Sequence, residues 1–167
     1  MYEICIYGNP ILRKKAKKIT TFDEQLAEFA DILVEKMYEY DGIGLAAPQI
    51  GESVRAIALD LSSEANSPIV LFNPEITWRS EDIDSDSEGC LSVPGIRGIV
   101  ERPISISLSA QDVTGAVVNF EKVDGLFARA LQHEVDHLDG VMFVDRLSSA
   151  KRSMLSGKLK KMAKQNK

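Results

Sequence analysis

The amino-acid sequence predicts an α+β fold, with antiparallel or mixed β-sheets packed around a central helix, an N-terminal helix and a C-terminal helix. Strand-like alternation and turn residues crowd the middle of the chain, whereas helical spacing occurs near both ends and once near residue 130. This order favours α+β, because a parallel sheet requires strands and helices to alternate. The helix near residue 130 carries apolar residues on more than one side, which is typical of a buried helix.

Length and composition indicate one globular domain. Hydrophobic residues make up 44% of the 167 positions and charged residues 27%, both ordinary values. No apolar run approaches the roughly 20 residues of a membrane span, and the first residues are acidic and short in apolar length, so we expect neither a membrane segment nor a signal peptide. Cys5 and Cys90 make no disulfide framework, which favours a reducing cytoplasm.

The first elements are a turn and a helix. Gly8-Asn9-Pro10 is a turn signal, and basic residues follow from Arg13 to Lys18. Thr21-Phe22-Asp23-Glu24 matches a capping box and predicts a helix that runs to about Tyr40. Apolar residues recur at helical spacing within it, namely Leu26, Phe29, Ala30, Leu33 and Met37.

Short strands are predicted next. One covers Val54 to Asp60, and another covers Ile69 to Phe72 and ends at Asn73-Pro74. Alternating apolar residues from Ile104 to Ala110, a turn at 112–115 and a return through Ala116 to Val123 predict a hairpin.

An acidic stretch, residues 82–88, imitates the start of a calcium-binding loop. An EF-hand requires glycine at loop position 6 and glutamate at position 12, where this chain has Ser87 and Val93. We therefore predict a solvated loop in which Glu88 is ordered, and no calcium site.

The central helix is predicted to begin at Gly125, with Asp124 as its cap, and to stop at Gly140. It contains Gln132-His133-Glu134-Val135-Asp136-His137, which holds the only two histidines in the chain. Positions i and i+4 lie on one helix face, so the two imidazoles can bind one metal ion, with Glu134 beside a bound water. The alternative is two histidines spaced by chance, which would seldom coincide with such a glutamate.

A catalytic metal site needs a third protein ligand and one open position. Downstream, no glutamate follows Glu134, and Phe143 stands where a metzincin has its third histidine, so only aspartates such as Asp145 remain. Upstream, Cys90 offers a thiolate, which suits Zn²⁺ or Fe²⁺ beside two imidazoles. A buried cysteine that only fills space remains the alternative for this residue.

Three segments together resemble the motifs of the peptide deformylase family, in the same order. They are Gly42-Ile43-Gly44-Leu45-Ala46-Ala47-Pro48-Gln49, Glu88-Gly89-Cys90-Leu91-Ser92 and Gln132-His133-Glu134-Val135-Asp136-His137. The resemblance extends over nearly the whole chain. It implies a hydrolase that removes the N-formyl group from formyl-methionine at the N-terminus of nascent polypeptides and releases formate. The chain also shows no internal repeat, linker or second domain, so we expect residues 1–147 to form a single catalytic domain, to which the basic helix 148–167 belongs.

The resemblance implies a role for each matching residue. Cys90, His133 and His137 would bind the metal, a metal-bound water would attack, and Glu134 would be the general acid/base. Gln49 and the backbone N–H of Leu91 would stabilise the oxyanion. The expected substrate-binding residues are Gly44 and Gly89, which would pair with the peptide backbone, Arg97 near the peptide, and Ile43 and Leu126 beside Ala130 as walls of an apolar methionine pocket.

Two neighbouring features are expected to lie outside the site. Arg129 is expected to point outward, with its stem covering apolar surface. Asp136 and Arg102 are candidates for a structural ion pair behind the metal.

The implied cofactor is one divalent metal ion, Fe²⁺ in the native enzyme, with Zn²⁺, Ni²⁺ or Co²⁺ accepted. From Ser148 onward the chain has seven basic and no acidic residues, whereas the preceding part has 13 basic and 25 acidic residues, a net charge of −12. This basic tail predicts attraction to a polyanion, and the resemblance indicates the ribosome; the alternative is a solvated helix. A monomer is expected.

Two other functions remain open. A different metalloamidase or protease is disfavoured by the missing downstream ligand. A metal-binding or ribosome-binding module without turnover is disfavoured because Gln49, Cys90, Glu134 and both histidines are present.

Overall fold

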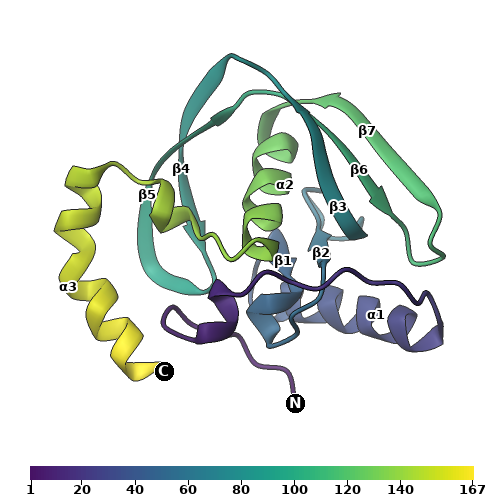
Figure 1. The fold of residues 1–167 in the computed structure, drawn as a ribbon, viewed down its shortest axis with the longest axis horizontal. Helices are drawn as coiled ribbons and strands as arrows, with labels where there is room; N and C mark the ends of the chain where they lie inside the picture. Colours follow the sequence, from purple (N-terminus) through teal and green to yellow (C-terminus); the bar gives the residue numbers. More distant parts are fainter.

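The computed structural model describes all 167 residues as two antiparallel sheets and three α-helices, which confirms the predicted α+β class (Figure 1). The larger sheet has the order β1-β2-β3-β6-β7, and the smaller consists of β4 and β5. The strands are β1 (Gly44–Ala46), β2 (Ala56–Leu59), β3 (Ile69–Arg79), β4 (Ile83–Cys90), β5 (Val93–Pro103), β6 (Ile106–Gln111) and β7 (Val117–Val123). The helices are α1 (Glu24–Glu39), α2 (Gly125–Leu138) and α3 (Ser149–Gln165), with short 3₁₀ segments η1 (Pro10–Arg13), η2 (Ala47–Ile50) and η3 (Phe143–Arg146).

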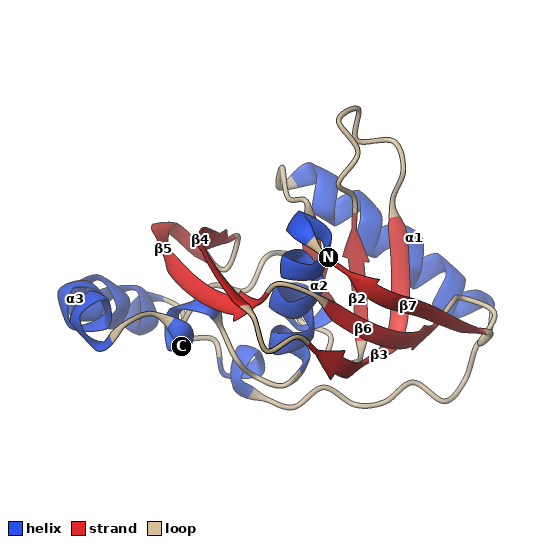
Figure 2. Ribbon diagram, turned by 90° about the horizontal axis from the view of Figure 1, so that it is seen from above, coloured by secondary structure: helices blue, strands red, loops and turns tan.

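Helix α2 lies at the centre of the molecule, between the five-stranded sheet and the β4–β5 ribbon (Figures 1 and 2). Strand β2 shows how the sheet is covered on both faces. Ile57 and Leu59 pack in the cluster that contains α2, whereas Ala56 and Ala58 pack in the cluster that contains α1. Successive strand residues point to opposite faces, so a strand that is apolar throughout fits between two helices.

The N-terminal helix begins two residues later than predicted. Asp23, not Thr21, is the N-cap of α1, and its carboxylate accepts a hydrogen bond from the N–H of Leu26 at 3.0 Å. The predicted capping box is therefore wrong, although the buried stripe of Ala30, Leu33 and Met37 is as expected. The final helix begins where predicted, with Ser148 as its N-cap.

Strand β3 does not end at Asn73-Pro74, as was predicted, but continues to Arg79. Asn73 takes a left-handed backbone conformation with φ of 50°, and the pairing with β6 shifts register between Phe72 and Glu75. The Asn73 side chain bonds to both the N–H and the C=O of Ile19, each at 2.8 Å. The turn signal thus marks a bulge within the strand, where proline is tolerated.

The acidic stretch is a strand rather than the predicted solvated loop. Residues 83–90 form β4, which pairs with β5 in a long antiparallel ribbon. Most residues of β4 are polar and exposed. The strand therefore has no alternation of apolar and polar residues from which it could have been predicted. Its partner supplies the buried residues Ile96 and Val100, and Glu88 turns inward.

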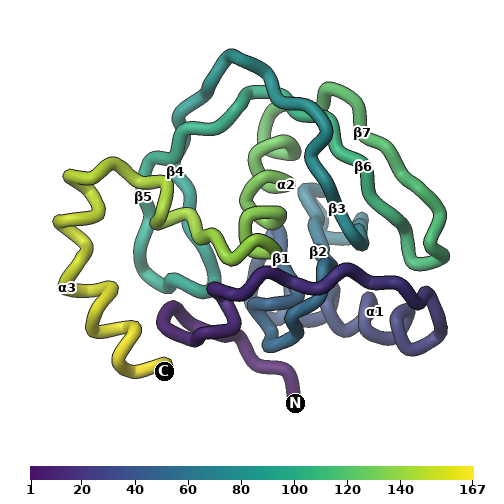
Figure 3. The backbone as a smooth tube through the Cα atoms, in the orientation of Figure 1, coloured from purple at the N-terminus to yellow at the C-terminus, as the bar shows by residue number.

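The C-terminal helix packs against the N-terminal turn. Leu155 joins the apolar cluster beneath β5, and Gly8 lies so close to α3 that a Cβ there would stand 2.4 Å from the Cα of Ala163. The backbone tube in Figure 3 shows the chain running from this turn across the molecule to α1. None of the three helices combines the length and hydrophobicity needed to traverse a lipid bilayer.

Candidate active site and metal centre

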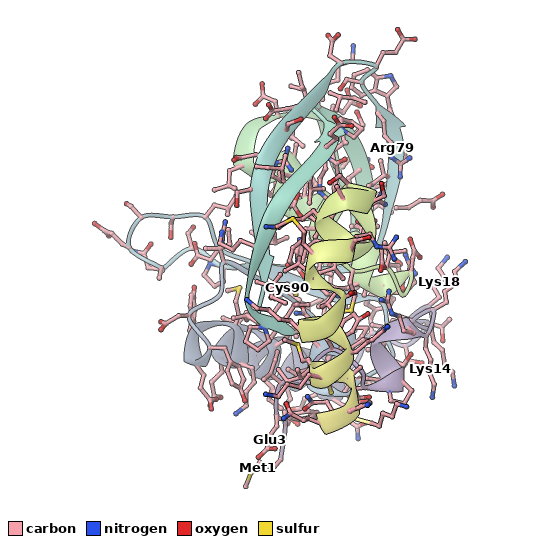
Figure 4. All side chains as sticks on the ribbon, turned by 90° about the vertical axis from the view of Figure 1, so that its left-hand side faces the viewer. Met1, Glu3, Lys14, Lys18, Arg79 and Cys90 are labelled. Atoms are coloured by element: carbon pink, nitrogen blue, oxygen red, sulfur yellow. The ribbon has the colours of Figure 1, made fainter.

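The end of β4 and one face of α2 bring three potential metal ligands together. Cys90 Sγ lies 3.3 Å from Nε2 of His137, and the donor atoms of Cys90, His133 and His137 all lie within 4.8 Å of one another. Figure 4 shows Cys90 on the β4–β5 ribbon, behind α3 in that view. Pairing with β5 shifts register between Gly89 and Cys90, at the end of β4.

This donor set fits a divalent cation of the zinc or ferrous type. One thiolate and two imidazoles are suitable ligands for either ion, and such sites keep one position open. His133 uses Nδ1 to contact Glu88 at 2.8 Å, which leaves Nε2 for a metal. His137 is buried, and its Nδ1 has no hydrogen-bond partner. Asp145, the downstream alternative, lies elsewhere and pairs with Arg13 at 2.5 Å.

Glu88 is the main feature of the site that the sequence did not reveal. Its carboxylate is only 6% exposed and contacts Arg102 at 2.6 Å, Arg129 at 2.6 Å and His133 at 2.8 Å. Burial alone would raise the pKa of Glu88, but the hydrogen bonds from Arg102 and His133 hold it well below its usual range. The carboxylate is therefore ionised and fixes the ring orientation of His133.

The same contacts act on His133. Burial opposes protonation, but the hydrogen bonds to Cys90 and Glu88 outweigh it and raise the pKa of His133 to about 10. Burial and the neighbouring His133 lower the pKa of His137 well below its usual value. The anionic neighbours of His133 thus favour its protonated form, whereas His137 is kept neutral. A histidine must be neutral to bind a metal ion, so metal binding would release the proton of His133.

Glu134 is buried beside the three potential ligands, and one of its carboxylate oxygens has no hydrogen-bond partner. Oε2 is inaccessible and makes no hydrogen bond. Burial raises the pKa of Glu134 to about 7. A carboxyl group with this pKa can both accept and return a proton near neutral pH.

Gln49 is held in one orientation by contacts at both ends of its amide. Oε1 accepts a hydrogen bond from the N–H of Ala46 at 2.9 Å. Nε2 donates to Ser92 Oγ at 3.1 Å and faces Cys90 Sγ at 3.4 Å. The amide N–H groups therefore point to the cysteine side of the site, and Ser92 is a supporting residue that sequence reasoning missed.

A cleft of about 710 Å³ opens beside these groups. Leu91 and all five predicted substrate-binding residues line it, namely Ile43, Gly44, Gly89, Arg97 and Leu126. Ile43 is 50% exposed and Leu126 56% exposed, so two large apolar side chains face this opening. Arg97 is anchored on the rim by its Nη2, which donates to the carbonyl of Ser87 at 3.2 Å.

The expectation that Arg129 points outward is wrong. Its side chain is buried, lines the cleft and contacts Glu88, because the β4–β5 ribbon covers this face of α2. The expected pair of Arg102 and Asp136 is present at 2.9 Å. Asp136 also contacts Arg146 of η3 at 2.6 Å. A continuous chain of ion pairs therefore runs from Glu88 through Arg102 and Asp136 to Arg146.

Comparison with known protein families gives one match. The model of the family described as polypeptide deformylase matches residues 1–153. The peptide deformylase of Thermotoga maritima is 44% identical over 164 residues, which cover 98% of each chain. That of Brucella suis is 42% identical, covering 97% of this chain and 93% of the relative.

Solved structures show the same similarity. The crystal structure of the Thermotoga maritima peptide deformylase matches with a TM-score of 0.84 at 44% identity, covering 89% of this chain and 98% of the other. The Plasmodium falciparum peptide deformylase matches with a TM-score of 0.92 at 35% identity, covering 98% and 96%.

Proposed function

We propose, on the premise that this chain belongs to the polypeptide deformylase family, that Cys90, His133 and His137 hold its catalytic metal ion and that Glu134 is its acid/base. The protein is an enzyme that hydrolyses the N-formyl group of nascent polypeptides and releases formate. The observation that carries the assignment of residues is the convergence of one sulfur and two ring nitrogens within 4.8 Å. Glu134, adjacent to His133 on α2, is buried beside them.

A formamide is a weak electrophile with a poor leaving group. Both the attack of water on the formyl carbon and the departure of the amine therefore require catalysis. The bound cation would supply Lewis acidity, which acidifies water and polarises the formyl carbonyl. Glu134 takes the proton from the attacking water and delivers it to the departing amine nitrogen. Its unpartnered Oε2 and its raised pKa of about 7 support this double role.

Negative charge develops on the formyl oxygen during attack. Gln49 would donate the side-chain N–H that faces Cys90 Sγ, and Leu91 would donate its backbone N–H; both residues line the cleft. A single donor of this kind typically contributes about 3–4 kcal/mol to transition-state stabilisation. The contact of Gln49 with Ala46 supports this role, because it fixes the amide orientation before substrate arrives.

The peptide is proposed to bind as an extended strand between the two sheets. β1 is an edge strand of the larger sheet, and β4 pairs only with β5, so each has a free edge. Gly44 and Gly89 lie on these strands and line the cleft. Backbone pairing at such edges gives affinity for any sequence, and side-chain pockets give selectivity. Ile43, Leu126 and Ala130 would receive the methionine side chain, and Arg97 would lie beside the peptide.

We propose Fe²⁺ as the native ion, with Zn²⁺, Ni²⁺ or Co²⁺ able to replace it. A thiolate-bound ferrous site is vulnerable to oxidation, so preparation in air favours replacement. The test is anaerobic purification followed by elemental analysis and a formate-release assay on a formyl-methionyl peptide. One equivalent of iron with rapid formate release is expected. Cleavage of internal peptide bonds without preference for formylated ends would instead favour a general metalloprotease.

The basic helix α3 is proposed to contact the ribosome. Five of its six cationic residues are exposed, and Leu155 is its only buried residue. Contacts to phosphate weaken steeply with salt, so cosedimentation with ribosomes should occur at low salt and disappear at high salt. Replacing Lys158, Lys160 and Lys161 with glutamine keeps the helix and should abolish binding. Unchanged cosedimentation would refute the proposal.

The remaining proposals concern size and location. We propose that the enzyme is a monomer in the cytoplasm, and that residues 1–147 form the catalytic domain, on which helix 148–167 packs. The two free cysteines support a reducing compartment. Light scattering coupled to gel filtration should give a mass near 18.4 kDa.

A further inference from the structure

Arg129 ties helix α2 to both strands of the β4–β5 ribbon. Its Nη1 donates to Glu88 Oε2 at 2.6 Å and to the carbonyl of Val100 at 3.0 Å, and its Nη2 donates to the carbonyl of Asp84 at 3.0 Å. The side chain is 8% exposed. A planar guanidinium fixed by three acceptors on two strands has little freedom to rotate.

Through this contact, Glu88 is held by α2 at two points one helical turn apart. Arg129 bonds Oε2, while His133 contacts Oε1 at 2.8 Å. Arg102 fills the other positions, with Nε 2.6 Å from Oε2 and Nη2 2.9 Å from Oε1. A carboxylate has about four acceptor sites, so all of them are used. The Glu88 carboxylate therefore cannot turn without breaking a bond.

The arrangement bears on metal binding because the ligands come from two elements. Glu88 precedes Cys90 by two residues on β4, whereas Arg129 and His133 both lie on α2. The contacts of Arg129 and His133 with the Glu88 carboxylate restrain the distance between α2 and β4. They also restrain the rotation of α2 about its own axis. These are the two quantities that decide whether the His133 ring lies beside the Cys90 sulfur.

We propose that Arg129 is a positioning residue for the metal site, acting through Glu88 to hold His133 beside Cys90. The inference rests on the proposed metal site and adds a residue whose side chain makes no hydrogen bond to any of the three proposed ligands. Removing the hydrogen-bond partners of metal-binding histidines typically lowers metal affinity about 10- to 100-fold. Loss of Arg129 is expected to act within this range.

The test measures Co²⁺ affinity of the full chain by competition with a chelator. Arg129→Met keeps an unbranched aliphatic side chain but loses all three hydrogen bonds. Arg129→Lys keeps the positive charge but not the planar guanidinium that bonds several acceptors at once. We expect affinity to fall about 10- to 100-fold in the methionine variant and by a smaller factor in the lysine variant. The thiolate-to-cobalt absorption band should shift, because the ligand geometry changes.

Arg146→Met is the matched control. Arg146 bonds Asp136 at 2.6 and 2.8 Å, at the far end of the same ion-pair chain, and makes no hydrogen bond to Glu88. It should lower the melting temperature while leaving Co²⁺ affinity within about twofold of wild type, as expected for a group without contact to the ligands' partners. Equal Co²⁺ affinities for the Arg129→Met and Arg146→Met variants would overturn the proposal.

A double-mutant cycle separates positioning from general destabilisation. If Arg129 acts through Glu88, adding Arg129→Met to Glu88→Gln should cost little further affinity, whereas independent effects would multiply. Should Arg129→Met fail to fold, wild-type affinity in Arg129→Lys overturns the proposal and reduced affinity supports it. Absence of Co²⁺ binding by the wild-type protein would refute the metal site itself, which is a different result.

Discussion

The side chain of Glu134 lies directly against the backbone of Gly44. A Cβ at Gly44 would stand 2.7 Å from Glu134 Oε1 and 3.1 Å from its carboxyl carbon. The edge strand β1 thus packs against the proposed acid/base with no room for a side chain. Glycine is required here by close approach, because Gly44 is not among the glycines with positive φ.

Gly44→Ala should displace the Glu134 carboxylate and lower kcat about a hundredfold or more, since misplacement of a reacting group by about 1 Å can cost this much. Metal content should be unchanged, because Gly44 contacts none of the ligands. Formate release and elemental analysis measure the two quantities. Activity close to wild type would show that Glu134 can move without penalty.

Gly157→Ala provides the control substitution and a prediction of its own. Gly157 lies within α3, and a Cβ there would meet nothing within 4 Å. Glycine inside a helix costs about 1 kcal/mol relative to alanine, so this variant should raise the free energy of unfolding by about 0.5–1 kcal/mol. Thermal melting should show a rise of about 1–4 °C. Unchanged formate release is also expected, and a lower melting temperature would contradict the prediction.

Glu134→Gln should abolish most of the activity while preserving the metal site. Glutamine has nearly the same shape but cannot take a proton from water, and general acid–base catalysis typically contributes about 10²–10⁴-fold. The loss should appear in kcat more than in KM, because Glu134 acts on the water. Steady-state kinetics of the iron-loaded protein provide the measurement. A loss below tenfold would exclude Glu134 as the acid/base.

Asp60 gives a prediction for the pH dependence of stability. Hydrogen bonds from Ser62 and Tyr38 lower the pKa of Asp60 to about 2. Because the folded-state pKa lies below the unfolded value, about 3.9, the stabilisation is complete above both values and is lost as pH falls toward 2.

Urea unfolding of wild type and Asp60→Asn at several pH values tests this. The difference in unfolding free energy between the two proteins should be constant above about pH 5 and should shrink between about pH 4 and pH 2. A difference that stays constant down to pH 2 would show that the Asp60 carboxylate is not stabilised in the folded state.

Some of the fold and site could be predicted because their signals are local. Two patterns have helical spacing and can be recognised without knowing what packs against them: the apolar Leu33 and Met37 of α1, and the pair His133 and His137. Gly140 was expected to terminate α2, and it does adopt a left-handed φ of 74°.

Other features depend on partners outside their own segment of the chain. β4 is stabilised by pairing with β5 and by the buried side chain of Glu88. Neither interaction can be predicted from the acidic composition of the segment. β5 does alternate, with Ile96 and Val100 buried and Arg97 exposed, but Gly98 obscures the pattern. Arg129 looked like a surface residue because the ribbon that covers it comes from 45 residues earlier in the chain.

The placement of the three proposed ligands has a consequence for the synthesis of the enzyme itself. Cys90 and His137 are 47 residues apart in sequence, and the first of them is already past the middle of the chain. A copy still emerging from the ribosome therefore has no complete site until His137 has been released from the exit tunnel. Its amino terminus leaves the tunnel before that moment, so any deformylation of that terminus during synthesis must be carried out by copies made earlier.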